Sequence, residues 1–266
     1  MTGRTVGAGC VWVASAGDAV AAEAHVVVVH GALDRSAGLL KLSRRLDTRA
    51  LVTRYDRRGY GRSRPHDGPF TIDEQVGDLV EVIEHGSPGG VPTVVVGHSY
   101  GGNVALAAVD RRPGLIDGVV TYEVPMSWRP WWCGQAGSDA LEWQHDPEEA
   151  AERFMRRLIG DARWERLPSS AREARRAEGF AMIGELTDLS ERQPWDPERI
   201  TVPVSCLYGE HARPDHRRGA AELSSLLPDA RLVEVAGAHH FGPNTHPDAV
   251  AAVVIELVER VTRSRS

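Results

Sequence analysis

The stretch Val94-Val95-Val96-Gly97-His98-Ser99-Tyr100-Gly101-Gly102 decides the fold of this chain. Three consecutive β-branched residues favour a strand that is buried on both faces. The following residues, Asn103–Val109, are compatible with a helix. A G-x-S-x-G pattern alone is a weak signal, but between a buried strand and a helix it predicts a sharp turn that exposes the Ser99 hydroxyl. Glycines two residues to either side of Ser99 leave room where Cβ atoms would clash.

Short runs of apolar, β-branched residues alternate with helical patterns along the rest of the chain. Runs that are apolar throughout are typical of strands covered on both faces of a sheet. The sequence therefore predicts the α/β class, with a mostly parallel sheet flanked by helices. The expected strands are Ala24–Val29, Ala50–Tyr55, Thr93–Gly97, Gly118–Tyr122, Val204–Tyr208 and Arg231–Val235, with Val11–Ala14 as a candidate edge strand.

Two of the expected helices show an apolar stripe that repeats every 3.6 residues. The first helix begins at Thr71, where Glu74 three residues later completes a capping-box pattern that satisfies two amide groups. Both stripes can cover a face of the sheet. They consist of Ile72, Val76, Leu79 and Ile83, and of Val250, Val253, Val254, Leu257, Val258 and Val261.

The alternation of strands and helices stops between Met126 and Pro194, in a segment rich in Arg and Glu. We expect residues 1–126 and 196–266 to form the core and residues 127–195 to form an inserted helical cap. Indole rings mostly pack cores, but one or two of those in the cap are expected to face a ligand. The Arg-rich stretch from Arg172 to Arg176 is more typical of a solvated helix face than of a binding site for an acidic substrate. The candidate substrate-binding residues are Trp128, Trp131 and Trp132.

Composition excludes several classes of protein. The chain has 266 residues, of which 42% are hydrophobic and 26% are charged, and its net charge is −6. It lacks the cationic excess of a nucleic-acid-binding protein, and its apolar runs fall short of the roughly 18 residues that span a membrane. The N-terminal stretch has no sustained apolar segment, so we expect no signal peptide. We expect a cytoplasmic protein with no nucleic-acid or membrane partner, and the sequence leaves the oligomeric state open. Cys10, Cys133 and Cys206 lie far apart, which predicts isolated reduced thiols and no metal site.

Three further segments, in the same order along the chain, resemble motifs of the α/β-hydrolase superfamily. They are Val29-His30-Gly31-Ala32, the loop from Tyr55 to Ser63, and Gly237-Ala238-His239-His240-Phe241. The resemblance covers nearly the whole chain outside the predicted cap and implies the α/β-hydrolase fold. It also implies that Ser99 is a nucleophile and that the backbone amides of Ala32 and Tyr100 form an oxyanion hole.

A serine hydroxyl needs an imidazole that removes its proton during attack and returns it to the leaving group. Two adjacent histidines follow the last expected strand. The resemblance favours His240 over His239 because Phe241 follows His240 as it does in the family. His98 and His30 are expected to pack and to form hydrogen bonds beneath the two turns.

The acid of the triad departs from the commonest family pattern, since Ala212 occupies the position that is usually aspartate after the penultimate strand. A carboxylate is still expected, because it fixes the tautomer of the base. Glu123 directly follows the strand Gly118–Tyr122, where some members of the family carry their acid, and it is the favoured candidate. Asp215 and Glu210 are the alternatives, and a triad without an acid remains open.

A serine nucleophile suits attack on an acyl carbon. In the family that this chain resembles, enzymes that attack an sp³ carbon have aspartate in place of this serine. The resemblance therefore predicts a serine hydrolase that cleaves an ester, thioester or lactone of a small or medium acyl substrate, with no cofactor and no metal. Carbon–carbon bond hydrolysis and cofactor-free perhydrolase or haloperoxidase activity are enzymatic alternatives. A small-molecule receptor on a hydrolase fold is the alternative outside the enzymes.

Overall fold

A computed structural model describes residues 3–7 and 11–265 of the chain. Eight strands form one sheet in the order β1-β2-β4-β3-β5-β6-β7-β8. The strands are β1 (Gly3–Val6), β2 (Val11–Ala16), β3 (His25–Val29), β4 (Leu51–Asp56), β5 (Thr93–His98), β6 (Gly118–Tyr122), β7 (Val204–Gly209) and β8 (Ala230–Val235).

Six neighbouring strands, β4, β3, β5, β6, β7 and β8, are parallel. At the other edge β2 pairs antiparallel with β4, and β1 pairs antiparallel with β2. The predicted α/β class with a mostly parallel sheet is confirmed. The candidate edge strand lies within β2, but β1 occupies the edge beyond it, which the sequence did not indicate. Because parallel strands end at the same edge of a sheet, the loops after β3, β5, β6 and β7 converge there.

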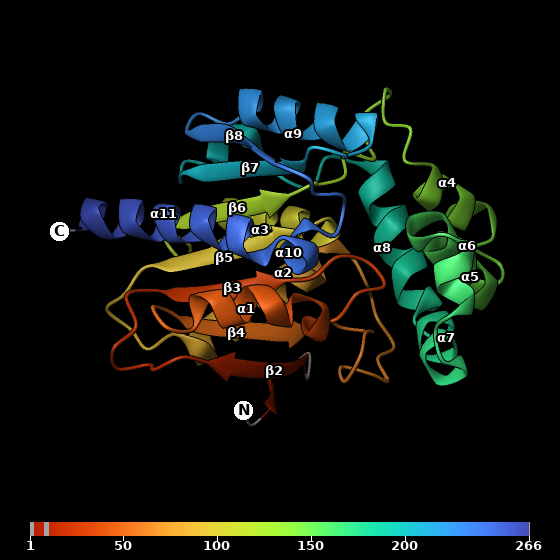
Figure 1. The fold of residues 1–266 in the computed structure, drawn as a ribbon, viewed down its shortest axis with the longest axis horizontal. Coiled ribbons are helices and arrows are strands. Elements are labelled where there is room, and N and C mark those ends of the chain that lie inside the picture. The colour runs from red at the N-terminus through yellow and green to blue at the C-terminus, as the bar shows by residue number, and fades with distance from the viewer. Residues whose placement is uncertain (1–2, 8–10, 266) are drawn as a thin grey trace.

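Helices cover both faces of the sheet (Figure 1). One face packs against α1 and α11, and the other packs against α2, α3 and α9. Successive valines of β3 point to opposite faces: Val27 packs on the side of α2, α3 and α9, and Val28 packs on the side of α1 and α11. These helices are α1 (Leu40–Leu46), α2 (Ile72–Gly86), α3 (Tyr100–Arg111), α9 (Pro214–Leu226) and α11 (Pro247–Arg265), and the short elements are η1 (Ser36–Leu39), η2 (Pro197–Arg199) and α10 (Gly242–Thr245).

The start of α2 agrees with the prediction in part. The Thr71 hydroxyl accepts a hydrogen bond from the Glu74 amide at 3.4 Å, as an N-cap residue does. The Glu74 carboxylate, however, forms an ion pair with Arg58 at 2.6 Å. The reciprocal half of the predicted capping box is therefore replaced by a contact to the loop after β4.

Five α-helices lie between β6 and β7 and gather at one end of the sheet (Figure 1). They pack around an apolar cluster that also includes Leu33, Tyr60 and Phe70 from the loops after β3 and β4, and in which the Trp164 side chain is fully buried. Arginines of α7 pair with glutamates of these helices and of the residues beside them, so this stretch stabilises the packing of the helices. The helices are α4 (Gln135–Glu142), α5 (Pro147–Ile159), α6 (Asp161–Glu165), α7 (Ser169–Arg176) and α8 (Gly179–Glu191).

A buried ion pair joins these helices to the sheet. Glu185 on α8 pairs with Arg57, and neither side chain is exposed to solvent. Arg57 also donates hydrogen bonds to the carbonyls of His30 at 2.9 Å and Gly31 at 3.1 Å. Because a buried charge must be paired and hydrogen-bonded, this contact fixes α8 against the turn that follows β3.

Two expectations from composition concern features away from the sheet. Cys133 and Cys206 are free thiols, whereas Cys10 lies outside the described residues. No helix within the described residues is both long enough and apolar enough to cross a membrane.

Candidate active site

Ser99 stands on the sharp turn between β5 and α3, with φ 53° and ψ −125°. A β-carbon at Gly101 would lie 2.4 Å from the Val29 carbonyl oxygen, and one at Gly97 would lie 2.5 Å from the Gly101 carbonyl oxygen. Only glycine permits this close approach of the backbone. The predicted turn is therefore present, and it holds Ser99 at the edge of the sheet where the loops converge.

Non-glycine residues with left-handed backbone angles gather at this edge. Among the described residues they are Leu33, Ser99 and Glu123, with φ of 49°, 53° and 49°. Leu33 follows the turn after β3, Ser99 follows β5, and Glu123 follows β6. Such angles cost free energy and persist where the surrounding structure imposes them, which is characteristic of functional sites.

The turn after β3 lies directly beside Ser99. A β-carbon on Gly31 would lie 3.0 Å from the Ser99 Cβ and 3.5 Å from its Oγ. Ala32 lines the same cavities as Ser99, and Tyr100 is the first residue of α3. The structure thus brings both predicted oxyanion-hole residues to the serine, together with the positive end of the α3 dipole.

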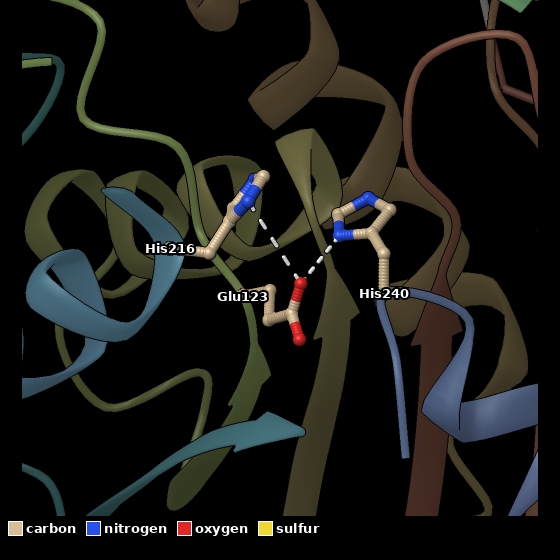
Figure 2. A group of neighbouring side chains, drawn as sticks. All are labelled: Glu123, His216 and His240. Atoms are coloured by element: carbon tan, nitrogen blue, oxygen red, sulfur yellow. Dashed lines mark hydrogen bonds and ion pairs between the residues drawn. The ribbon is translucent and has the colours of Figure 1, made fainter. Parts of the chain in front are cut away.

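His240 and Glu123 form a hydrogen bond of 2.7 Å between Nδ1 and Oε2 (Figure 2). The other carboxylate oxygen of Glu123 accepts a bond from the Gly209 amide at 3.0 Å. Burial raises the pKa of Glu123, but the hydrogen bond and the charge of His240, the charge of His216 and the Gly209 amide together lower it below its ordinary value. An ionised carboxylate only accepts hydrogen bonds, so His240 carries its proton on Nδ1 and leaves the Nε2 lone pair free.

The other histidines predicted to support the turns do so. His98 donates from Nε2 to the His240 carbonyl at 2.8 Å, and burial lowers the pKa of His98 to about 3. His30 bonds the Gly31 carbonyl through Nδ1 at 2.8 Å and accepts from the Arg57 amide at 2.9 Å through Nε2. His239 contributes its carbonyl, which accepts a bond from the Tyr122 hydroxyl at 2.8 Å.

The alternative acids occupy other places. Glu210 accepts a hydrogen bond from the Gly237 amide at 2.8 Å and thereby holds the turn before the histidines. Asp215 is buried in the first turn of α9, 3.5 Å from Arg213 and 3.7 Å from His216 Nδ1. The shortest contact between His240 and a carboxylate in the described chain is the one with Glu123.

His216 is a site residue that the sequence did not single out. Its Nδ1 lies 3.9 Å from Glu123 Oε2, and its ring centroid is 4.8 Å from that of His240 (Figure 2). Burial lowers the pKa of His216 to about 4. No local motif indicates His216, because its position depends on how α9 docks against β7 and β8.

Glu123, His216 and His240 also form the one described group whose side chains could hold a metal ion. Their ligand atoms lie within 4.8 Å of one another. Two imidazoles and a carboxylate are ordinary zinc ligands. In this structure, however, His240 Nδ1 and Glu123 Oε2 lie 2.7 Å apart, so these two ligand atoms form a hydrogen bond with each other.

Two adjoining cavities of about 300 and 540 Å³ meet at Ser99 and His240. Phe154, Leu158 and Ile159 of α5 line both cavities, so the inserted helices cover the serine. These volumes suit a small organic molecule.

The structure places the three tryptophans that were expected to bind substrate in different surroundings. Trp132 lines the larger cavity. Trp128 instead packs edge-on against Trp195 at 5.7 Å, and Trp131 lies beneath the guanidinium of Arg218 at 4.2 Å. Neither of these two side chains lines the cavities, and both are half-buried.

Similar proteins agree with this architecture. A 2-(acetamidomethylene)succinate hydrolase from Mesorhizobium japonicum is 24% identical over 251 residues, which is 86% of each chain. A pimeloyl-[acyl-carrier protein] methyl ester esterase from Aromatoleum aromaticum is 28% identical over 184 residues, covering 62% of this chain and 73% of the esterase. The fold is also similar to that of a malate-bound thermophilic esterase from Thermogutta terrifontis, with a TM-score of 0.75, 19% identity and 98% of each chain covered.

A model of the alpha/beta hydrolase family matches residues 26–253, which include the turn after β3, the serine turn, the inserted helices and both adjacent histidines. The match spans most of the chain, and the relatives by sequence carry the names of hydrolases. This protein is therefore an enzyme of the alpha/beta hydrolase family.

Proposed function

We propose that this enzyme is a serine hydrolase that cleaves an ester, thioester or lactone through an acyl-enzyme on Ser99. The observation that carries the proposal is the 2.7 Å hydrogen bond between His240 and the buried Glu123, beside the strained serine turn. His240 is the general base and acid, and Glu123 is the acid of the triad. Residues 127–195 form the cap and residues 1–126 and 196–266 form the core.

In the first half of the reaction, the Ser99 Oγ attacks the acyl carbon and its proton passes to His240 Nε2. Glu123 stabilises the imidazolium as it forms, because its pKa is held low and it stays ionised. The carbonyl oxygen becomes an oxyanion that accepts hydrogen bonds from the amides of Ala32 and Tyr100. The proton on Nε2 then moves to the leaving alcohol, thiol or enol, and the acyl-enzyme remains.

In the second half, water takes the place of the leaving group. His240 Nε2 removes a proton from this water, whose oxygen attacks the acyl carbon. The tetrahedral intermediate collapses, Ser99 Oγ regains a proton from His240, and the carboxylic acid is released. The cap supports this scheme, since α5 covers both cavities and restricts the access of bulk water to the acyl-enzyme.

The experiment is covalent labelling with a fluorophosphonate probe, combined with the turnover of p-nitrophenyl esters. Wild-type protein should label, and Ser99→Ala should neither label nor turn over substrate while keeping its melting temperature. Ser127→Ala is the matched control, because Ser127 is a second serine in the wall of the larger cavity and should still leave one labelled residue. Labelling of Ser99→Ala, or unchanged turnover by it, would refute the assignment.

A further inference from the structure

The cavities around Ser99 are lined by more positive than negative side chains, although the chain as a whole carries a net charge of −6. The negative groups in their walls are Asp34 and Asp215. The positive groups are the five arginines Arg35, Arg157, Arg163, Arg175 and Arg213.

Most of these arginines already have a carboxylate partner. Arg35 and Arg175 share the buried Glu178, at 2.7 and 3.2 Å. Arg157 pairs with Asp139 at 2.9 Å, and Arg213 lies 3.5 Å from Asp215. Their charges are therefore offset within the protein.

Arg163 differs from the others. Of the five, it alone has no ion pair with a carboxylate in the described chain, and it lines both cavities. Its neighbour on α6, Trp164, is fully buried, which anchors the backbone that carries Arg163 beside the cavities. The side chain is exposed, which leaves it accessible to a ligand.

Between Arg163 and Ser99 the shared walls are apolar, since they contain Phe154, Leu158 and Ile159 of α5. A ligand that satisfies both features has an apolar middle, a reacting acyl group at one end and a single negative charge at the other. The planar fork of an arginine matches a carboxylate with two parallel hydrogen bonds.

On this basis, and resting on the proposed function, we propose that the substrate carries a free carboxylate that binds Arg163 while its ester, thioester or lactone group lies at Ser99. The substrate class is thus the monoesters and related monoacyl derivatives of short dicarboxylic acids. Arg163 is a specificity-determining residue of the cap.

The test compares esters that differ by one charge, namely the monomethyl and dimethyl esters of succinate, glutarate and adipate. Binding to the Ser99→Ala protein is measured by calorimetry, which requires no turnover, and kcat/KM is measured on the wild type. We expect at least one monomethyl ester to bind more tightly than its dimethyl counterpart. Arg163→Gln should weaken that binding about tenfold, because an ionic hydrogen bond is lost. The affinity for the dimethyl ester should change less than about twofold.

Arg166→Gln is the matched control. Arg166 lies three residues further along, is exposed, forms no ion pair in the described chain and is absent from the walls of both cavities. Arg166→Gln should leave the binding affinity for both types of ester unchanged. Equal binding of the two ester types to the protein, or equal weakening of both by Arg163→Gln, overturns the proposal.

Failure of the proposed function gives a different result. If Ser99 is not a nucleophile, fluorophosphonate labelling fails, but the preference for monoanions over neutral esters still decides whether Arg163 binds a carboxylate. If labelling succeeds and no monomethyl ester binds, the serine chemistry stands and the assignment of the substrate class is overturned.

Discussion

Replacing Glu123 by glutamine tests the proposed triad at the atom on which it depends. The Glu123 side chain is fully buried, with Oε1 bonded to the Gly209 amide at 3.0 Å and Oε2 bonded to His240 at 2.7 Å. The Gly209 amide is a donor, so the amide oxygen of glutamine must stay beside it. The NH₂ group then faces His240 Nδ1, which has to become an acceptor.

This change reverses the tautomer of the imidazole. With Nδ1 as an acceptor the proton moves to Nε2, and the base has no lone pair for the Ser99 hydroxyl. The loss of the charged hydrogen bond costs about 1.5–3 kcal/mol. Because the reversed tautomer must also be corrected before each turnover, as in the asparagine variant of a serine protease, we expect kcat to fall about 10³- to 10⁴-fold, or about 4–5.5 kcal/mol.

The assay is the steady-state hydrolysis of a p-nitrophenyl ester, with kcat and KM measured separately. KM should change little, because Glu123 does not line the cavities. Asp215→Asn is the matched control, since it removes the other buried carboxylate near His216 and should lower kcat less than about tenfold. The opposite ranking would move the acid to Asp215, and no effect of either variant would leave a triad without an acid.

The double variant Glu123→Gln with Ala212→Asp extends the same reasoning. It returns a carboxylate to the position that the family commonly uses, on the loop after β7. Partial recovery of kcat, by about tenfold or more, would show that a negative charge beside His240 is what the first substitution removed. Failure of any carboxylate at 212 to raise kcat would contradict the idea that the two positions serve the same imidazole.

Three other perturbations follow from buried or clustered groups. Burial lowers the pKa of His25 to about 4, so this histidine lowers the stability of the fold as the pH falls from 6.5 towards that value. His25→Asn should therefore flatten the decline of Tm between about pH 7 and about pH 4.5. An unchanged slope of Tm against pH would contradict this. Glu185→Leu leaves the buried Arg57 without its partner and should lower the free energy of unfolding by about 3–5 kcal/mol in urea titrations, whereas a loss below about 1 kcal/mol would show that Arg57 finds solvent. Treatment with EDTA should leave esterase activity unchanged, because the proposed triad uses His240 Nδ1 as a proton donor and not as a metal ligand. Loss of activity that added zinc restores would instead assign the group of Glu123, His216 and His240 to a metal ion.

The parallel sheet and the serine turn could be predicted because their signals are local. Runs such as Val94 to Val96 are apolar on both faces, and the glycines at 97 and 101 permit the close backbone contacts of the turn. The edge strand β1 was missed because it is short and three of its four residues are exposed, so its apolar pattern is weak. Its pairing with β2 is a tertiary interaction that no periodicity records.

The walls of the cavity could not be predicted in the same way. Trp128, Trp131 and Trp132 lie within five residues, yet only Trp132 reaches the cavity, and the difference arises from the packing partners Trp195 and Arg218 far along the chain. Arg163 and His216 belong to the same category. Each is placed by the docking of a helix, and not by the residues next to it in the sequence.

The position of Glu123 has a structural consequence for the neighbouring strand. With the carboxylate at the end of β6, the end of β7 supports it through the backbone, since the Gly209 amide bonds Glu123 Oε1 at 3.0 Å. A β-carbon at 209 would lie 2.3 Å from the Ala238 carbonyl oxygen, so glycine is required where the end of β7 passes close to the backbone of Ala238. In the proposed triad the loop beyond β7 needs no acid, which is consistent with alanine at 212, and His216 lies 3.9 Å from the Glu123 carboxylate. In the proposed triad, a carboxylate directly after β6 therefore takes the place of one in the loop after β7, and the first turn of α9 places the imidazole of His216 beside it.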